Sequence, residues 1–84
     1  MSYEKVTQVK SRLIIGTKQS LKALKTGIIS EVFIAVDADQ EVTQGVVDIA
    51  NELEVPVHYV NSKEDLGRAC GIDVHAATVS IKKP

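Results

Sequence analysis

Gly-Thr-Lys-Gln-Ser-Leu-Lys, at residues 16–22, follows the short apolar run Leu-Ile-Ile of residues 13–15 and opens a helical pattern. A strand, a glycine turn and a helix start, in this order, direct backbone N–H groups and the positive end of the helix dipole toward one point. Lys18 and Lys22 are four residues apart, so they lie on one helical face beside that point. The stretch therefore predicts a site for an anionic ligand.

Alternating helical and strand patterns surround this stretch. Helices are predicted at residues 3–11, 17–26, 40–54 and 62–70, and strands at residues 13–15, 32–36, 57–60 and 78–82. The alternation favours an α/β fold with a single sheet and helices on both faces, in one domain that spans residues 1–84. The direction of the final strand stays open.

The apolar positions in these segments predict which faces are buried. The continuous apolar run at 32–36 is typical of a strand covered on both faces. The polar–apolar alternation at 78–82 instead predicts a half-covered strand. Asp39 and Ser62 are expected to cap helices, and Gly27 is expected to end one. Two helical core stripes are expected, at Leu21, Leu24 and Ile28 and at Val42, Val46, Ile49, Ala50 and Leu53.

Charge is distributed unevenly along the chain, although the net charge is only −1. Residues 1–27 carry a net charge of +5, residues 28–61 carry −7 with no Lys or Arg, and residues 62–84 carry +1. Such a division favours one surface that meets a polyanion and another that faces away from it. The alternative is that each half has an ordinary solvated face.

The sequence offers little for catalysis or metal binding. His58, His75 and Cys70 lack the spacing of metal ligands. Cys70 lies on an apolar helical stripe, which predicts a buried small residue rather than a reactive thiolate. Three acids at residues 37, 39 and 41 could hold Mg²⁺, but helix capping and the helix dipole explain them better. We therefore expect no enzyme activity, no metal and no cofactor.

The composition is typical of a small soluble domain, with 44% hydrophobic residues. Two Tyr, one Phe and no Trp are too few for a platform on which single-stranded bases stack. The one Cys cannot form an internal disulfide. The first residues lack the apolar segment of a signal peptide, and no apolar run reaches the length of about 18 residues that a membrane helix needs. We expect a cytoplasmic protein that is not bound to a membrane.

The segment at residues 72–77 is unusually apolar for a loop, because it contains Ile72, Val74, Ala76 and Ala77. These side chains either tuck under the edge of the sheet or form an apolar shelf against which an extruded nucleobase packs.

Several stretches together resemble the ribosomal-protein "L-seven-Ae" family. They are Gly-Thr-Lys-Gln-Ser-Leu-Lys-Ala-Leu-Lys-Thr-Gly at 16–27, Val-Phe-Ile-Ala at 32–35 with Asp37 and Asp39, and Leu-Gly-Arg-Ala-Cys-Gly-Ile-Asp-Val at 66–74 with Ala76 and Ala77. The resemblance runs over nearly the whole chain and is strongest to the small bacterial members.

The resemblance implies a three-layer α/β/α sandwich with a four-stranded mixed sheet. It also implies a monomer that binds kink-turn RNA, a bent duplex with tandem G·A pairs and an extruded nucleotide, in ribosomal or riboswitch-like RNA. Residues 16–22 would meet the G·A pairs, residues 72–74 would cover the extruded nucleotide, and Lys63 would neutralise phosphate. The implied RNA-binding residues are Gly16, Thr17, Lys18, Gln19, Lys22, Lys63, Ile72, Asp73, Val74 and His75.

Three positions depart from the family pattern. Lys18 replaces an Asn, Gln19 replaces a Glu, and His75 stands where proline is common. Lys is only a donor, and Gln lacks the anionic acceptor of Glu, so we expect a larger electrostatic share in binding. Two alternative functions remain open: a domain that binds a small molecule or nucleotide phosphate, and a purely structural ribosomal component.

Overall fold

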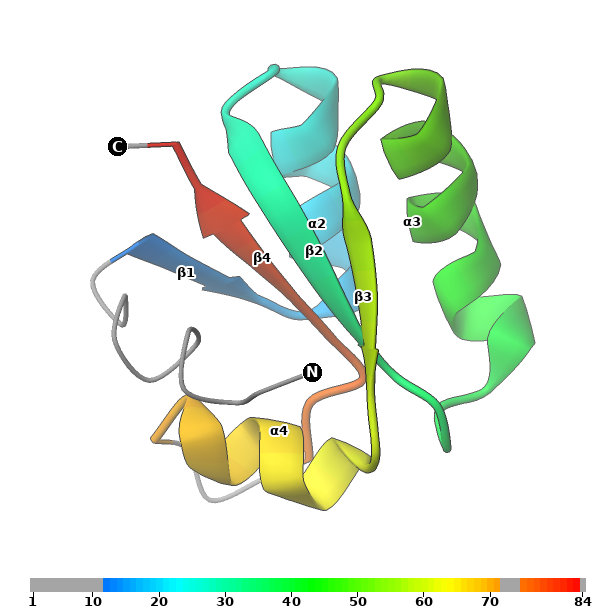
Figure 1. The fold of residues 1–84 in the computed structure, drawn as a ribbon, viewed down its shortest axis with the longest axis vertical. Coiled ribbons are helices and arrows are strands. Elements are labelled where there is room, and N and C mark those ends of the chain that lie inside the picture. The colour runs from blue at the N-terminus through cyan, green and yellow to red at the C-terminus, as the bar shows by residue number, and fades with distance from the viewer. Residues whose placement is uncertain (1–11, 72–74, 84) are drawn as a thin grey trace.

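Four strands form one mixed sheet in the computed structural model, which describes residues 12–71 and 75–83 (Figure 1). The helix expected at residues 3–11 lies outside the described residues. In chain order, the described elements are β1 (Leu13–Ile15), α2 (Thr17–Lys25), β2 (Ile29–Ala35), α3 (Gln40–Glu52), β3 (Val57–Val60), α4 (Lys63–Ala69) and β4 (Thr78–Lys82).

The strand order in the sheet is β1-β4-β2-β3. β2 and β3 are parallel, whereas β4 is antiparallel to both of its neighbours, β1 and β2. The pairing gives the direction of the final strand, which the sequence had left open. The sheet is mixed, as the family resemblance implied.

Helices cover both faces of the sheet, which confirms the three-layer arrangement. α2 and α3 lie side by side on one face, and α4 lies on the other (Figure 1). Two hydrophobic cores separate the layers. One joins Leu24, Val46 and Ala50 of the helices to Val32 and Ile34 of the sheet. The other core contains Phe33, Ala35, Val60, Leu66, Cys70, Ala76, Val79 and Ile81.

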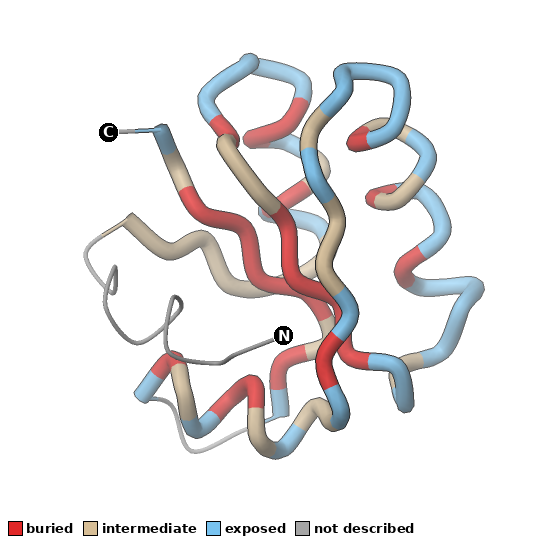
Figure 2. The backbone as a smooth tube through the Cα atoms, viewed as in Figure 1, coloured by how far each residue is buried: buried red, intermediate tan, exposed pale blue. Residues whose placement is uncertain are grey.

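β4 is covered on both faces, so the expectation of a half-covered strand is wrong. Residues 78–81 are all buried, and the tube is red along this strand (Figure 2). Thr78 pairs with Ile34 and Ser80 with Val32, so both hydroxyl side chains point toward the α2–α3 layer. The alternation therefore comes from two small polar residues beneath a helix and does not mark a solvent face.

β2 begins and ends earlier than its apolar run suggested. It starts at Ile29, because polar residues continue the pairing: Ser30 Oγ donates a hydrogen bond to the carbonyl of Ile81 at 3.2 Å. It ends at Ala35, whose carbonyl accepts the Ala38 N–H in a turn. Val36 lies in that turn and is 61% exposed, so its predicted place in the strand is wrong.

The helices bury narrower stripes than the sequence suggested. Ile28 is 42% exposed, because the chain turns at Gly27, which has a φ of 75°, and leaves the helical stripe. Val42 and Leu53, at the two ends of α3, are also about half exposed. The buried side of α3 consists of Thr43, Val46 and Ala50.

Across residues 12–71 and 75–83, no helix combines the length and the apolar character needed to cross a membrane.

Candidate nucleic-acid interface

The start of α2 differs from the starts of the other two described helices. The N-cap of α2 is Gly16, which has no side chain to accept a hydrogen bond from the first turn. Asp39 caps α3 by accepting the Glu41 N–H at 2.9 Å, and Ser62 caps α4 by accepting the Asp65 N–H at 3.1 Å, as expected. The first N–H groups of α2, which have no acceptor inside the helix, therefore face outward for an external acceptor.

Glycine at position 16 is required by the backbone conformation. Its φ is 111°, a region that L-residues rarely adopt, while a Cβ built there would meet no atom within 4 Å. The Gly16 carbonyl accepts the Ser20 N–H at 3.0 Å and begins the helix. The predicted role of glycine at the turn between β1 and α2 thus has a conformational basis.

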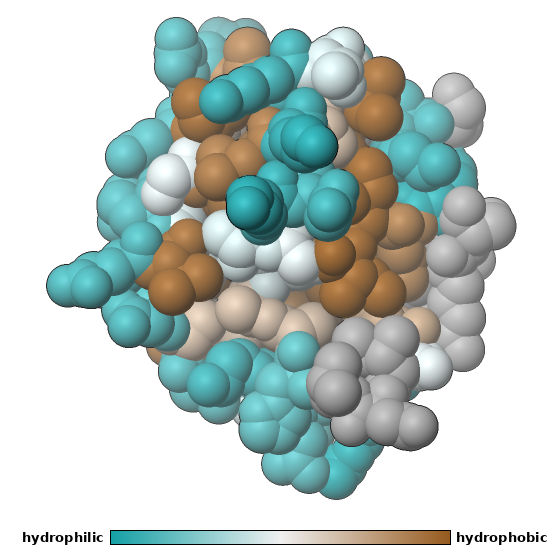
Figure 3. All heavy atoms as spheres, turned by 180° about the vertical axis from the view of Figure 1, so that it is seen from behind, coloured by the Kyte–Doolittle hydropathy of each residue, from teal (hydrophilic) through white to brown (hydrophobic). Residues whose placement is uncertain are grey.

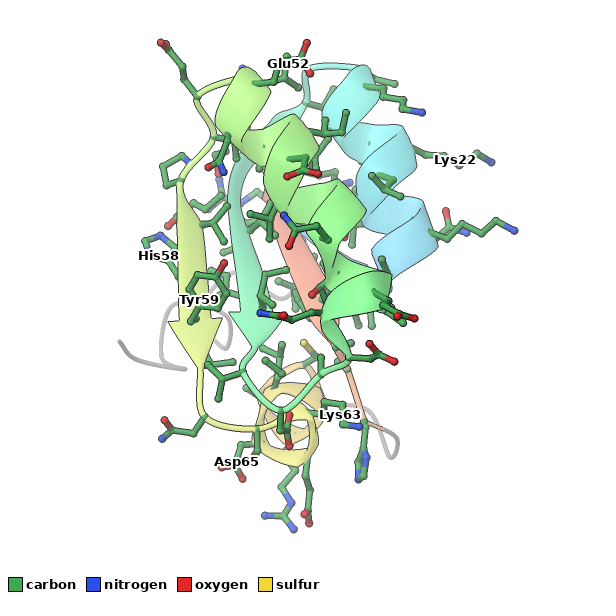
Figure 4. All side chains as sticks on the ribbon, turned by 90° about the vertical axis from the view of Figure 1, so that its right-hand side faces the viewer. Lys22, Glu52, His58, Tyr59, Lys63 and Asp65 are labelled. Atoms are coloured by element: carbon green, nitrogen blue, oxygen red, sulfur yellow. The ribbon has the colours of Figure 1, made fainter. Side chains whose placement is uncertain are left out.

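Three lysines of α2, at positions 18, 22 and 25, are exposed. Among the residues that the structure describes, ion pairs join His58 to Glu31 and Arg68 to Glu64 and Asp65, and none involves these lysines. Figure 4 shows Lys22 extending away from α3 and the sheet. The three ammonium groups are available to an anionic partner.

An open groove of about 450 Å³ runs between α2 and the edge strand β1. Gln19, Lys22 and Thr26 supply its polar rim. The apolar lining is Leu13, Ile14, Ile15, Ala23 and Ile28. On the α2–α3 side of the molecule, hydrophobic surface lies directly beside hydrophilic side chains (Figure 3). This lining suits a ligand with apolar faces and polar edges.

Sequence reasoning identified two residues of this groove, Gln19 and Lys22, but missed Thr26 and the contribution of β1. β1 has only three residues, which are too few for their pattern to reveal which side faces a groove. Ile28 escapes notice because its spacing from Leu21 and Leu24 predicts a core position. The exposure of Ile28 beside a lysine-bearing helix becomes evident only from the turn at Gly27.

Hydrogen bonds bring the start of α2 to the end of the apolar loop. The Gly16 N–H donates to the carbonyl of Thr78 at 2.9 Å. The hydroxyls of Thr17 and Thr78 lie 3.0 Å apart and share a hydrogen bond. Thr78 directly follows residues 75–77, so the structure places the start of α2 next to the described end of the apolar loop.

Lys63 lies near the same loop. The Ala76 N–H donates to the carbonyl of Lys63 at 3.1 Å, and the Lys63 N–H donates to Asp37 Oδ1 at 2.9 Å. Asp37 therefore orients the start of α4, a structural role that sequence reasoning did not assign to it.

The loop itself is only partly described. Ile72, Asp73 and Val74, predicted to cover an extruded nucleotide, lie outside the described residues. His75 is exposed, while Ala76 is 2% exposed and belongs to the core around Phe33. For Ala76, tucking beneath the sheet is the correct alternative of the two considered.

The other chemically notable side chains have structural partners. His58 Nε2 lies 2.9 Å from Glu31 Oε1, and its ring centroid lies 5.1 Å from that of Phe33. His58 is on β3, at the opposite edge of the sheet from the groove beside β1 (Figure 4). Cys70 is buried in the core, as its place on the apolar stripe predicted.

The sequence over residues 1–84 matches the ribosomal protein L7Ae/L30e/S12e/Gadd45 family. The chain belongs to this family. Family membership confirms the resemblance seen in residues 16–27, 32–39 and 66–77.

Alignments with related proteins cover almost the entire chain. An "RNA-binding protein" of Halalkalibacterium halodurans is 53% identical over 99% of this chain and 100% of its own length. The "RNA-binding protein YbxF" of Geobacillus stearothermophilus is 51% identical over 96% of this chain and 98% of its own.

A solved structure of the "15.5kD RNA binding protein" of Giardia lamblia has the same fold as this L7Ae-family chain. The TM-score is 0.88 with 32% sequence identity, and the alignment covers 94% of this chain and 68% of the Giardia chain. The four-stranded mixed sheet with its helices is therefore the fold of the family.

Proposed function

We propose that this L7Ae-family protein binds RNA through the start of α2, the groove beside it and the loop that leads into β4, and that its target is a kink-turn. One observation carries the proposal. The start of α2 has no side-chain cap, its lysines form no ion pair among the described residues, and it is hydrogen-bonded to Thr78, which directly follows the apolar loop. The relatives named as RNA-binding proteins, which align over almost the full chain, support the same class of ligand.

The lysines of α2 suit a phosphate backbone. Lys18, Lys22 and Lys25 form a stripe of about 10 Å along the helix, along which a strand of the phosphate backbone could lie. Their charges are not neutralised by acids among the described residues. They would supply the electrostatic part of binding.

The groove residues suit the edges of bases. Gln19 offers both a donor and an acceptor, and Lys22 donates to the O6 and N7 acceptors of guanine. G·A pairs widen the RNA groove and expose such edges, whereas regular A-form RNA hides them. The apolar lining from β1 adds a surface for the flat faces of nucleotides.

Binding of this kind would favour the bent RNA. A kink-turn interconverts between extended and bent forms, and a protein that contacts the bent form better shifts the population toward it. The protein acts by recognition and needs no bond-making chemistry, so no catalytic group is invoked.

An electrophoretic shift with two RNA duplexes tests the proposal. One duplex contains a kink-turn, and the other has its G·A pairs replaced by Watson–Crick pairs. The kink-turn is expected to bind at least about tenfold more tightly, the worth of one base-edge contact. Equal affinity for the two duplexes would contradict kink-turn recognition while leaving general RNA binding in place.

The groove gives some support to the alternative of a small ligand, since its volume of about 450 Å³ falls in the range of small-molecule sites. A mononucleotide that shifts the amide resonances of residues 16–19 more strongly than kink-turn RNA does would favour this alternative.

A further inference from the structure

Thr78 makes two different contacts with the start of α2. Its carbonyl accepts the Gly16 N–H at 2.9 Å, and its hydroxyl shares a hydrogen bond with the Thr17 hydroxyl at 3.0 Å. The Thr78 side chain is 0% exposed. Thr17 is the first residue of α2, so both contacts act on the helix end from which the outward N–H groups project.

The hydroxyl pair is unusual within its surroundings. Ser20 of α2 and Ser80 of β4 are both 0% exposed, and among the described residues neither Oγ has a hydrogen-bond partner. Burial of hydroxyls between α2 and β4 therefore does not require that they pair. The Thr17–Thr78 contact is a specific link between the helix and the strand.

The residues just before Thr78 are fixed as well. The Ala77 carbonyl accepts the Ala35 N–H at 3.0 Å, and the Ala76 N–H donates to the Lys63 carbonyl at 3.1 Å. The end of the loop is thus attached to β2 and α4, and Thr78 attaches it to α2. Thr78 therefore joins the start of α2 to the described end of the loop, residues 75–77.

We propose that Thr78 is a positioning residue for RNA recognition, which holds the start of α2 at a fixed separation from the end of the loop. This inference rests on the proposed function. A helix start that is already fixed before binding loses less entropy when its outward N–H groups and its side chains meet the G·A edges of a bent RNA. A regular duplex does not present those edges and gains nothing from the link.

The Thr78→Val variant removes the hydroxyl while keeping the shape of the side chain. Thr78→Ser retains the hydroxyl, and Thr17→Val removes the partner hydroxyl. Ser80→Ala is the matched control, since it removes an equally buried but unpaired hydroxyl from the same face of the same strand. For each full-length variant, the dissociation constants for the kink-turn and for the G·A-replaced duplex are measured, together with the thermal unfolding midpoint.

The ratio of the two affinities is the decisive quantity. Thr78→Val is expected to lower it roughly three- to tenfold, the worth of one hydrogen bond, with the affinity for the control duplex unchanged. Thr78→Ser and Ser80→Ala should keep the ratio of the natural protein. Thr17→Val should reduce it as Thr78→Val does, and the double variant should be no worse than either single variant.

Three outcomes would overturn the inference: an unchanged ratio in Thr78→Val, an equal loss in Ser80→Ala, or additive losses in the double variant. A fall in the unfolding midpoint with an unchanged ratio would show that Thr78 acts only on stability. If the natural protein binds both duplexes with equal affinity, the proposed function itself is contradicted. That result is obtained before any variant is measured, so it is distinguishable from failure of the inference about Thr78.

Discussion

Lys22 has a different environment from the other two lysines of α2. It lies at the rim of the groove beside β1, where it adjoins Gln19 and the apolar lining, whereas Lys18 and Lys25 are not among the groove residues. All three are exposed. A lysine beside a groove can reach a base edge, while a lysine on an open helix face meets phosphate only. We therefore propose that Lys22 contacts a base edge, whereas Lys18 and Lys25 contact phosphates.

Replacement of Lys22 by Ala is expected to weaken kink-turn binding by about 1–3 kcal/mol, as for the loss of a base contact. Fluorescence anisotropy with a labelled kink-turn and with the G·A-replaced duplex measures the effect. Lys25→Ala is the control, and it should weaken binding to both duplexes alike. If Lys22→Ala also affects both alike, Lys22 contacts phosphate and not a base.

At the scale of the element, the start of α2 combines a positive-φ backbone conformation, which glycine adopts readily, with an open cap. Gly16 has a φ of 111° and offers no side chain to the N–H groups of the first turn. Asp39 and Ser62 cap the other two described helices with their side chains. An Asp or Ser at position 16 would likewise accept a hydrogen bond from one of those N–H groups and leave it unavailable to a ligand. Glycine thus both permits the turn and keeps the helix end available, which ties the local conformation to the ligand site.

Gly16→Ala is expected to destabilise the fold by about 1–3 kcal/mol, because alanine must adopt a strained backbone conformation. Urea unfolding measures the change. Gly45→Ala provides the contrast: Gly45 lies inside α3 with an ordinary helical conformation, and an added Cβ would meet only Leu21 at 3.9 Å. That variant should gain roughly 0.5–1 kcal/mol from helix propensity. Equal stability of the two variants would show that position 16 is unstrained.

The sequence predicts elements well where one physical cue dominates. The caps at Asp39 and Ser62 and the turn at Gly27 follow from side-chain chemistry and glycine conformation, and the structure confirms them. Prediction fails at β4, where small hydroxyl residues under α2 imitate a solvent face. It also fails at the ends of β2 and α3, where tertiary packing rather than hydrophobicity decides what is buried.

The candidate site was predictable to a similar degree. Residues 16–22 stand out by their glycine, lysines and helix start, all of which are local features. The groove with β1 and the link through Thr78 depend on contacts between segments distant in the chain. Those contacts follow from the strand order, which no local pattern encodes.

At the scale of the whole molecule, α2 and α3 lie side by side on one face of the sheet, yet they carry opposite charge. The exposed residues of α2 are rich in lysine, and residues 28–61 carry seven acids with no Lys or Arg. The absence of ion pairs to the α2 lysines among the described residues keeps the two charges separate. An RNA would be attracted to one side of the molecule and repelled from the adjacent one, which orients its approach.

Kink-turn binding should weaken steeply with salt. If Lys18, Lys25 and Lys63 meet phosphates while Lys22 meets a base, a plot of the logarithm of the binding constant against that of the salt concentration is expected to have a slope of roughly −2 to −3. Titrations at several concentrations of potassium chloride measure the slope. A nearly flat plot would mean that hydrogen bonds to bases, and not these cations, dominate the affinity.

The position of β4 also has a consequence for synthesis of the protein. The strand formed by residues 78–82 is the partner of β1 and lies between β1 and β2. A nascent chain that has emerged only as far as α4 therefore lacks the strand that joins its first strand to the rest of the sheet. The same residues hold the start of α2 through Thr78. The surface proposed to bind RNA is therefore complete only when β4 has joined the sheet, after residues 78–82 have left the ribosome.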